Sequence, residues 1–288
     1  MELFLTKYIV SELIYKFITG RRGEIIMLKK TILILAILTF VFAGAVQADN
    51  HVLSVGATPV PHSEILDFIR DDLAEAGIEL EIVEFTDYVT PNISLDDGSI
   101  DANFFQHVPY LEQFNADRGL DLVSAIKVHV EPIGLYSDKY TSLEEIPEGA
   151  SIALPNDPSN EGRALILLHN NGVITLDDPT NLSATPIDIA ENPKNLKFEE
   201  LEAAQLPRVL PDVAAAVINT NYALEAALNP LEDALIMEGS DSPYVNVIAV
   251  RNGDQDSEKI QTLKEIIQSE KVKEFILEEY EGAVVPAF

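Results

Sequence analysis

The stretch "SIALPNDPSNEGRALILLHNNG" (residues 151–172) joins two kinds of secondary structure in one segment. Its first six residues are mostly apolar and are expected to form a strand. The remainder predicts a helix, because Asp157 is a favoured N-cap and Pro158 suits the first helical position. A buried strand that runs directly into a helix is typical of α/β proteins, in which the two kinds of element alternate.

The same alternation continues on both sides of this stretch. Before it, strands are expected over residues 51–58, 78–85 and 101–105, and helices over residues 62–77 and 107–119. After it, strands are expected over residues 195–201, 213–218 and 242–250, and helices over residues 222–228, 256–269 and 271–280. This order predicts an α/β fold with a largely parallel sheet.

The two series of strands and helices follow each other without a repeat or a flexible linker, which predicts two α/β lobes joined by continuous segments. We expect residues 49–130 and 247–288 to form lobe 1, and residues 131–246 to form lobe 2. The chain is expected to cross between the lobes near residues 128–137 and 242–250. Because ligands of open α/β sheets bind beyond the carboxyl ends of the strands, functional residues are expected where strands end.

The first 48 residues contain the pattern of an export signal. A basic start after Met27 is followed by an apolar run over residues 32–42 and by small residues up to Ala48. We therefore expect residues 27–48 to be a signal peptide that is cut after Ala48, and residues 1–26 to be an upstream extension from a mis-assigned start codon. Two alternatives stay open: a genuine long basic region before the apolar run, and an uncleaved segment that anchors the chain in a membrane.

The composition excludes several classes of protein. The chain has a formal net charge of -29 and no Cys. Without Cys it can form no disulfide, Cys-ligated zinc site, iron–sulfur cluster or thiol nucleophile. The acidic excess argues against nucleic acid as a partner, because binding phosphate backbones requires basic clusters. Such acidity is found in proteins of saline habitats, where salt screens the self-repulsion, and also in ordinary exported proteins.

Short motifs of common enzyme and nucleotide-binding classes are missing. The sequence contains no G-x-G-x-x-G, P-loop, G-x-S-x-G or H-E-x-x-H motif. The five His residues are spread along the chain, so no local pattern supports a metal site. We therefore expect neither a metal nor a cofactor.

Polar and aromatic side chains gather where predicted strands end. They occur in the segments "FTDYVTPN" (85–92), "DANFFQHVPYLEQFN" (101–115), "NDPSNEGR" (156–163) and "VINTNYA" (217–223). A further signal is the Asn inside the apolar run "SPYVNVIAV" (242–250), because a buried amide demands a partner. The candidate site residues are Tyr88, Phe105, His107, Tyr110, Asn160, Arg163, Asn219 and Asn246.

Each candidate also has an ordinary structural interpretation. Tyr88 and Phe105 fit core positions. Asn160 and Asn219 fit helix caps or turns, and Arg163 fits a solvated surface charge. Together, however, the candidates describe a site with aromatic walls, amide groups and an Arg at a helix start that can hold a carboxylate. This set suits a zwitterion with an apolar tail, such as an amino acid. We expect Arg163 to line an open cleft and to contribute little to core stability.

Seven segments, in order along the chain, resemble the NlpA lipoprotein family, which includes the MetQ-like methionine-binding proteins of D-methionine-type ABC importers. The segments are "FTDYVTPN", "DANFFQHVPYLEQF", "VEPIGLYS", "PNDPSNEGRALILL", "ENPKNLKFEELEAAQLPR", "AVINTNYA" and "SPYVNVIAVR". The resemblance covers about residue 51 to the C-terminus. It implies a periplasmic-binding-protein fold, in which two α/β lobes close on a ligand in the cleft between them.

The resemblance also implies roles for the candidate residues. A methionine side chain is expected among the ring-bearing residues Tyr88, Phe105, His107 and Tyr110. The carboxylate is expected on Arg163 with Asn160 nearby, and the polar end of the amino acid on Asn219 and Asn246. In such a pocket, sulfur–aromatic contacts add to the burial of apolar surface.

The implied partners are methionine or a similar amino acid, together with an ABC permease and its ATPase. The chain itself is expected to be a monomer and not an enzyme. Family members usually carry a lipobox Cys after the signal, and this sequence has none. A soluble periplasmic protein is therefore expected after signal cleavage. The choice between L- and D-methionine, another small amino acid and a methionine-containing dipeptide stays open.

Two other functional classes are considered. An enzyme on the same scaffold would use His107 as a general base, but the sequence offers no nucleophile or second catalytic partner for it. An envelope adhesin or structural protein would have no reason to retain the polar residues Asn160, Arg163, Asn219 and Asn246.

Overall fold

The computed structural model describes residues 51–239 and 242–288, and residues 51–288 form one compact unit. The predicted signal peptide (27–48) and upstream extension (1–26) lie outside the described residues. Within the described ranges, no helix combines the length and the apolar character needed to span a membrane.

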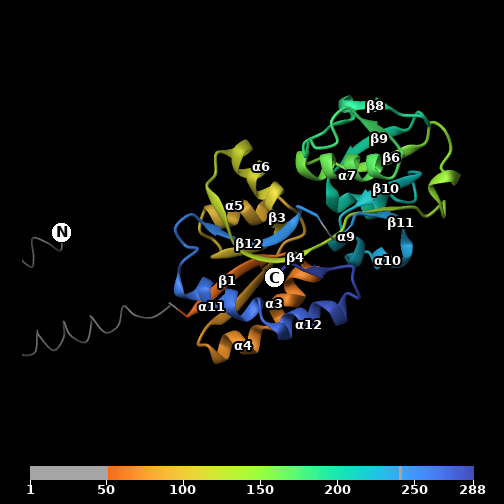
Figure 1. The fold of residues 1–288 in the computed structure, drawn as a ribbon. Helices are drawn as coiled ribbons and strands as arrows, with labels where there is room; N and C mark the ends of the chain where they lie inside the picture. The colour runs from red at the N-terminus through yellow and green to blue at the C-terminus, as the bar shows by residue number, and fades with distance from the viewer. Residues whose placement is uncertain (1–50, 240–241) are drawn as a thin grey trace, which may run out of the picture. The chain divides into compact units, whose positions relative to one another are not determined.

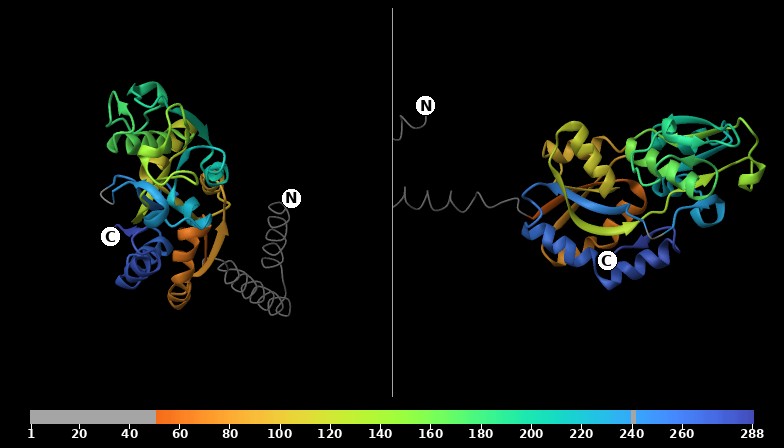
Figure 2. Two further views of the ribbon diagram at one scale, coloured as in Figure 1. Left: turned by 90° about the vertical axis from the view of Figure 1, so that its right-hand side faces the viewer. Right: turned by 45° about the horizontal axis from the view of Figure 1, so that its top comes forward.

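Two large β-sheets organise this unit, and Figures 1 and 2 show each of them with its own helices. The first sheet has the strand order β13-β4-β12-β3-β1-β2. Its strands are β1 (Val52–Ala57), β2 (Glu79–Glu84), β3 (Ala102–His107), β4 (Leu122–Val130), β12 (Val245–Arg251) and β13 (Val285–Pro286).

The second sheet has the strand order β11-β5-β10-β6-β9. Its strands are β5 (Gly134–Tyr136), β6 (Ser151–Pro155), β9 (Lys197–Leu201), β10 (Ala215–Ile218) and β11 (Ala234–Met237). A small separate sheet pairs β7 (Thr175–Leu176) with β8 (Ile189–Glu191).

Helices cover both faces of the first sheet. On one face lie α3 (Glu64–Phe68), α4 (Arg70–Glu75), α11 (Glu258–Ile267) and α12 (Glu270–Glu279). On the other face lie α5 (Thr90–Asp96) and α6 (Val108–Arg118). Strand β12 shows how the sequence produces this arrangement, because Ile248 and Val250 point into one core and Val247 and Ala249 into the other. The sheet is therefore the middle layer of three.

The second sheet is covered in the same way. Helix α7 (Pro158–Asn170) packs on one face and α8 (Leu206–Val209) on the other. Helix α9 (Thr220–Glu225) lies between the two large sheets in Figure 1, and its Leu224 packs against the core of the first sheet. Helix α10 (Pro230–Asp233) precedes β11.

The predicted strands and helices are present, but several of them differ in extent. Helix α7 begins as predicted, because the Asp157 side chain accepts a hydrogen bond from the backbone N–H of Asn160 at 3.0 Å. The helix predicted over residues 62–77 is two short helices, α3 and α4. It breaks at Ile69, whose N–H bonds the carbonyl of Leu66 three residues back rather than four. Strand β3 runs past its predicted end because its pairing with β12 continues to His107.

The prediction of a largely parallel sheet is correct for three strands of each sheet and wrong for the others. Strands β2, β1 and β3 are parallel, as are β9, β6 and β10. Strand β12 is antiparallel to both β3 and β4, and β5 is antiparallel to β10 and β11. The reason is the path of the chain: β12 re-enters the first sheet from the second and inserts between two earlier strands in the opposite direction.

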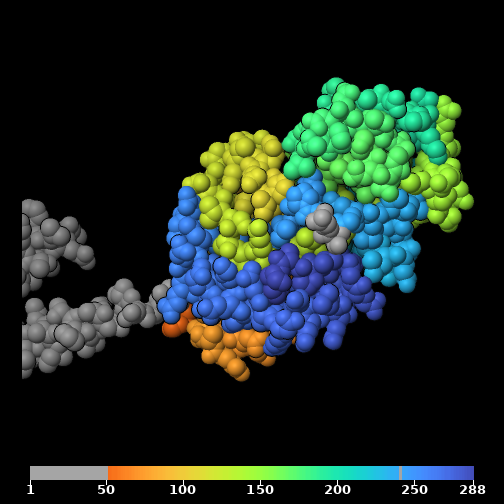
Figure 3. All heavy atoms as spheres, in the orientation of Figure 1, coloured from red at the N-terminus to blue at the C-terminus, as the bar shows by residue number. Residues whose placement is uncertain are grey.

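The chain passes from β4 in the first sheet to β5 in the second through residues 131–133. It returns between β11 and β12, a passage that contains residues 240–241, which are not described. The elements of the two sheets are in contact on the face drawn in Figure 3. This path brings residue 131, the end of β3 and the start of β12 close to the start of α7 and the end of β10.

We predict that Gly162→Ala destabilises the protein, because Gly162 lets α7 approach another backbone segment. A Cβ at this position would lie 2.3 Å from the carbonyl oxygen of Leu182 and 2.9 Å from the nitrogen of Ala184. Backbone atoms cannot move aside as a flexible side chain can, so the free energy of unfolding should fall by about 1–3 kcal/mol. Urea unfolding measures this change.

Gly239→Ala is the matched control, because a Cβ there would have no atom of the described residues within 4 Å. Its unfolding free energy should stay within about 0.5 kcal/mol of wild type. Equal stability of the two variants would show that α7 and residues 182–184 do not approach as closely as described.

Candidate functional site

A cavity lies where the two sheets meet. All eight predicted site residues line it, namely Tyr88, Phe105, His107, Tyr110, Asn160, Arg163, Asn219 and Asn246. Four further residues that the sequence analysis did not select complete the wall, namely Gln106, Glu131, Thr220 and Asn221.

One wall of the cavity is aromatic. Phe105 at the end of β3 and Tyr110 in the first turn of α6 are 3% and 7% exposed. The ring centroid of Tyr88 lies 5.8 Å from each of theirs. The hydroxyl of Tyr110 donates to the backbone carbonyl of Tyr88 at 2.7 Å, which holds the loop after β2 against α6. The rings therefore form a fixed apolar surface.

A chain of buried hydrogen bonds joins the two sheets across the cavity. The backbone N–H of Tyr110 donates to His107 Nδ1 at 3.1 Å, so the other ring nitrogen, Nε2, carries the proton. His107 Nε2 then donates to Asn160 Oδ1 at 3.1 Å, and Asn219 Nδ2 donates to the same oxygen at 2.8 Å. The amide nitrogen of Asn160 donates to both carboxylate oxygens of Asp157, which sets the orientation of its amide group. Every polar side-chain atom of Asn160 is thus engaged.

The fixed orientation of Asn160 leaves a neighbouring atom free. Because Asn219 uses its Nδ2 as the donor, its Oδ1 faces the cavity region as an acceptor, and it has no partner among the residues that the structure describes. Asn221 has the opposite feature, a hydrogen-bond donor without a partner among the described residues. Its Oδ1 accepts from the hydroxyl of Tyr88, and its buried Nδ2 donor has no partner within residues 51–239 and 242–288. Buried polar atoms normally have hydrogen-bond partners, so both atoms point to a polar ligand.

Arg163 lies in α7 and is only 2% exposed, so it is not a solvated surface charge. Its Nε and Nη2 donate to the carboxylate of Glu238, and Nη2 also donates to the backbone carbonyl of Glu131 at 2.6 Å. The guanidinium stacks on the ring of Tyr244, 4.3 Å from its centroid. Its Nη1 makes no hydrogen bond to the described part of the chain. This nitrogen remains for an anion in the cavity.

The expectation that Arg163 lines an open cleft and contributes little to the core is therefore wrong. The ion pair with Glu238 was not foreseen, because the two residues come from α7 and from the end of β11. Since Glu238 is itself largely buried, loss of Arg163 would leave a carboxylate without its partner.

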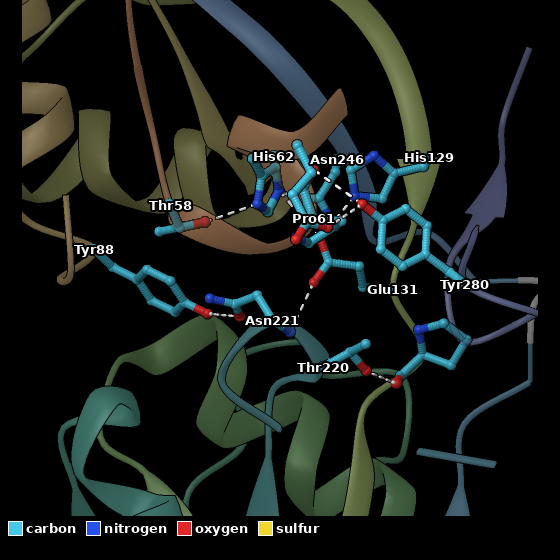
Figure 4. Close-up of polar contacts among 12 residues, drawn as sticks. Thr58, Pro61, His62, Tyr88, His129, Glu131, Thr220, Asn221, Asn246 and Tyr280 are labelled. Carbon is cyan, nitrogen blue, oxygen red and sulfur yellow. Dashed lines mark hydrogen bonds and ion pairs between the residues drawn. The ribbon is translucent and has the colours of Figure 1, made fainter. Parts of the chain in front are cut away.

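The polar wall also contains Glu131, the first residue after β4 (Figure 4). Its Oε1 accepts a hydrogen bond from His129 Nε2 at 2.7 Å and lies 3.1 Å from His62 Nε2. Its Oε2 accepts from the backbone N–H of Asn221 at 3.1 Å. The ring of His62 is oriented by Thr58, whose hydroxyl lies 2.7 Å from its Nδ1. Glu131 thus connects the first sheet to α9.

Glu131, His62 and His129 also have the composition of a metal site, since their ligand atoms lie within 4.8 Å of one another. In the structure these atoms contact each other directly, and the cluster needs no ion to satisfy the carboxylate. Asn246 contributes to the same network, because its Oδ1 lies 3.2 Å from His62 Nε2. His62 is therefore the buried hydrogen-bond partner that we expected for Asn246.

A model of the NlpA lipoprotein family matches residues 53–288. The chain belongs to the NlpA lipoprotein family. This match covers both large sheets and every residue that lines the cavity. The family predicted from seven sequence segments is confirmed.

Several relatives of this NlpA-family chain are known. The D-methionine-binding lipoprotein MetQ of Salmonella typhi is 44% identical over 245 residues, which are 84% of this chain and 90% of that protein. The methionine-binding lipoprotein MetQ of Bacillus subtilis (strain 168) is 41% identical over 268 residues, which are 88% of this chain and 98% of that protein. These relatives are named as binding proteins and not as enzymes, which agrees with the expected class of function.

A solved structure extends this similarity to the fold. A nutrient-binding protein from Burkholderia cenocepacia, bound to methionine, is 50% identical, covers 82% of this chain and 100% of its own, and superposes with a TM-score of 0.79. The methionine-binding protein MetQ, also solved, gives a TM-score of 0.81 at 42% identity and covers 83% of this chain and 99% of its own. The predicted periplasmic-binding-protein fold is therefore confirmed.

The sequence contained a signal for two of the residues that were missed. Glu131 directly follows a strand, and Asn221 lies within the segment "VINTNYA", so the strand-end rule that selected the other candidates applies to both. Glu131 was overlooked because acidic residues are abundant in this chain. Asn221 falls just before the helix expected over residues 222–228, whereas in the structure it lies in the first turn of α9.

We predict that His107 makes the stability of the protein depend on pH. Burial, followed by the charge of Arg163, lowers the pKa of His107 from 6.5 to about 3. The unfolded chain binds a proton on His107 below about pH 6.5, whereas the folded protein does so only near pH 3, so this residue destabilises the fold as the pH falls between these values. Its contribution amounts to about 2 kcal/mol at pH 5 and vanishes at pH 8.

The His107→Asn variant tests this, because Asn still caps α6 but does not titrate. The difference in unfolding free energy between variant and wild type should move by about 2 kcal/mol in favour of the variant from pH 8 to pH 5. Urea unfolding of both proteins at both pH values gives the difference. The same difference at both values would mean that His107 titrates in the folded protein with its ordinary pKa.

Proposed function

We propose that this chain is the extracytoplasmic solute-binding protein of an ABC importer, which captures methionine and delivers it to the permease and its ATPase. The observation that carries the proposal is the cavity, which is lined by aromatic rings, a buried Arg and amide atoms that have no partner among the described residues. Relatives at 41% to 50% identity that are named for methionine, or solved with it, support this choice of ligand.

The aromatic wall suits the apolar part of methionine. In this proposal the thioether chain lies against Tyr88, Phe105 and Tyr110, where apolar burial and sulfur–aromatic contacts stabilise it. The ring of His107 completes this wall. Since its Nδ1 accepts from a backbone N–H and its Nε2 donates to Asn160, His107 has no ring nitrogen left to act as a general base. This supports binding rather than catalysis.

The polar wall suits the α-carboxylate and the amino group. In this proposal the carboxylate accepts hydrogen bonds from Arg163 Nη1 and Asn221 Nδ2, the donors without partners among the described residues. Asn219 Oδ1 is an acceptor for the amino group, with Asn246 on the same wall. Asn160 positions His107 and Asn219, because its own polar atoms are all engaged.

We further propose that residues 49–130 and 247–288 form one lobe and residues 131–246 the other, and that the lobes close on the ligand about the two connecting segments. Export with cleavage after Ala48 would release a monomer into the periplasm, since the sequence holds no Cys for a lipid anchor. Cell fractionation and N-terminal sequencing of the recovered protein test this part, and recovery in the membrane pellet with residues 27–48 attached would contradict it.

The function is tested by calorimetric titration of the processed chain with L-methionine, D-methionine and norleucine. Mass spectrometry of the denatured protein first identifies any ligand that copurifies with it. We expect at least one methionine enantiomer to bind. Norleucine, in which a methylene group replaces the sulfur, should bind about 2- to 10-fold more weakly. A folded protein that binds no methionine would overturn the proposal.

We predict that Arg163→Ala weakens methionine binding by roughly 30-fold to several thousand-fold, because the buried carboxylate loses its charged partner. The same change should lower the free energy of unfolding without ligand by about 3 kcal/mol, since it leaves Glu238 unpaired. Titration calorimetry and urea unfolding measure the two effects.

The double variant Arg163→Ala/Glu238→Gln separates the two roles of Arg163. Removing both charges of a buried pair costs less stability than removing one, so the double variant should recover much of the lost stability. It should not recover methionine binding. Recovery of binding would show that Arg163 acts on the fold and not on the ligand.

A further inference from the structure

Glu131 occupies an unusual position for an acidic side chain in a protein of net charge -29. Most acidic side chains of soluble proteins are solvated, yet Glu131 is 5% exposed and lines the cavity. Its side chain lies between His129 in β4 and His62 in the segment after β1 on one side, and Asn221 at the start of α9 on the other (Figure 4). It is therefore a buried carboxylate at the point where the two sheets and the cavity meet.

The hydrogen bonds of Glu131 leave room for one more donor. A carboxylate offers about four acceptor positions on its two oxygens. Oε1 uses two of them, for His62 and His129, and Oε2 uses one, for the backbone N–H of Asn221. One position on Oε2 remains, on a residue that borders the cavity.

The surroundings keep this carboxylate ionised. Burial acts to raise the pKa of Glu131, but His62 and His129 outweigh it and hold the pKa well below its usual value. His129 cannot neutralise the charge by holding two protons, because its Nδ1 is buried without a partner in the described structure. Burial accordingly lowers the pKa of His129. The cavity thus borders an anionic group.

A cationic group lies beside this anion without being neutralised by it. Arg163 contacts the backbone carbonyl of Glu131 at 2.6 Å, but its ion pair is with Glu238. The Glu131 carboxylate instead contacts the two His rings and Asn221. An α-amino acid carries its carboxylate and its ammonium group on one carbon atom, so it needs opposite charges that lie close together and remain available. Glu238 pairs with Arg163, and the two His rings contact Glu131, but Arg163 Nη1 and one acceptor position on Glu131 Oε2 have no partner among the described residues.

We propose that Glu131 holds the ammonium group of the amino-acid ligand and makes the site select zwitterionic amino acids over the corresponding carboxylic acids, an inference that rests on the proposed function. Asn219 Oδ1, the unpartnered acceptor of the same cavity, is a second contact for the ammonium group. His62 and His129 are positioning residues that orient the carboxylate of Glu131.

The test compares two ligands that differ only in the ammonium group, L-methionine and 4-(methylthio)butanoate. They share the thioether chain and the carboxylate, so a defect in either of those subsites changes both affinities equally. Wild type should bind methionine at least about 30-fold more tightly than the acid, because the acid has no ammonium group to pair with the buried carboxylate of Glu131. In Glu131→Gln the methionine affinity should fall by at least about 30-fold and the acid affinity by less than about 3-fold, so that the preference nearly disappears.

Glu238→Gln is the matched control, because it removes an equal charge from the other side of Arg163. It should change both affinities by the same factor and leave the preference for methionine intact. If Glu131→Gln does not fold, Glu131→Asp provides the test, since it keeps the charge but withdraws it by one methylene; the preference should then fall about 10-fold. Titrations in EDTA ensure that no cation on the His62–His129–Glu131 cluster contributes.

An unchanged preference in a folded Glu131 variant would overturn the proposal, and so would equal losses for both ligands, which would mean that Glu131 only supports the fold. Both outcomes leave the proposed function intact, because wild type still binds methionine. Failure of wild type to bind methionine would instead overturn the proposed function itself.

Discussion

The carbonyl oxygen of Asn160 accepts one hydrogen bond from His107, at the end of β3, and one from Asn219, at the end of β10. A single buried atom therefore ties the first sheet to the second. Its orientation is set by Asp157, which caps α7 and accepts from the amide nitrogen of Asn160. Because an amide has only one acceptor end, this arrangement determines which atoms of the surrounding residues are donors and which are acceptors. The polarity of the whole cavity depends on it.

The same polarity couples the ligand to the arrangement of the sheets. Asn219 Oδ1 and Asn221 Nδ2 are buried without partners in the described structure, and leaving such an atom unsatisfied costs about 1–3 kcal/mol. If the sheets moved apart, water would solvate both atoms and the cost would disappear. A ligand that offers an ammonium group to one and a carboxylate to the other removes the cost without any movement. Such a ligand therefore stabilises the closed arrangement relative to an open one, which is the requirement for a population shift.

The sequence predicted those parts of the structure that depend on neighbouring residues. Helix α7 follows from Asp157, Pro158 and the apolar positions after them, and all of these signals lie within one segment. The insertion of β12 between β3 and β4 could not be predicted in this way, because it pairs strands that are far apart in the chain. Family resemblance supplied the fold that local patterns left open.

The site shows the same division between local and long-range information. Its ring-bearing residues and Asn residues follow strand ends, and the cavity includes every one that was selected. Two ion pairs of the site were not predictable, because they join distant segments: Arg163 with Glu238, and Glu131 with His62. A count of 48 acidic residues makes any single Glu uninformative in the sequence. Glu131 differs from the many solvated acidic side chains because it is buried, and that burial depends on the fold.

The two walls of the cavity contribute differently to selectivity. An apolar wall discriminates weakly, because one missing or added methylene changes binding by only about 1–3 kcal/mol. The aromatic surface of Tyr88, Phe105 and Tyr110 thus favours a long apolar tail without strictly excluding its analogues. A polar wall discriminates more strongly, because a ligand without the matching group leaves buried donors, acceptors or charges unsatisfied. In the proposed binding mode, the class of ligand is therefore decided by Arg163, Glu131 and the Asn residues, whereas the aromatic rings decide among the members of that class.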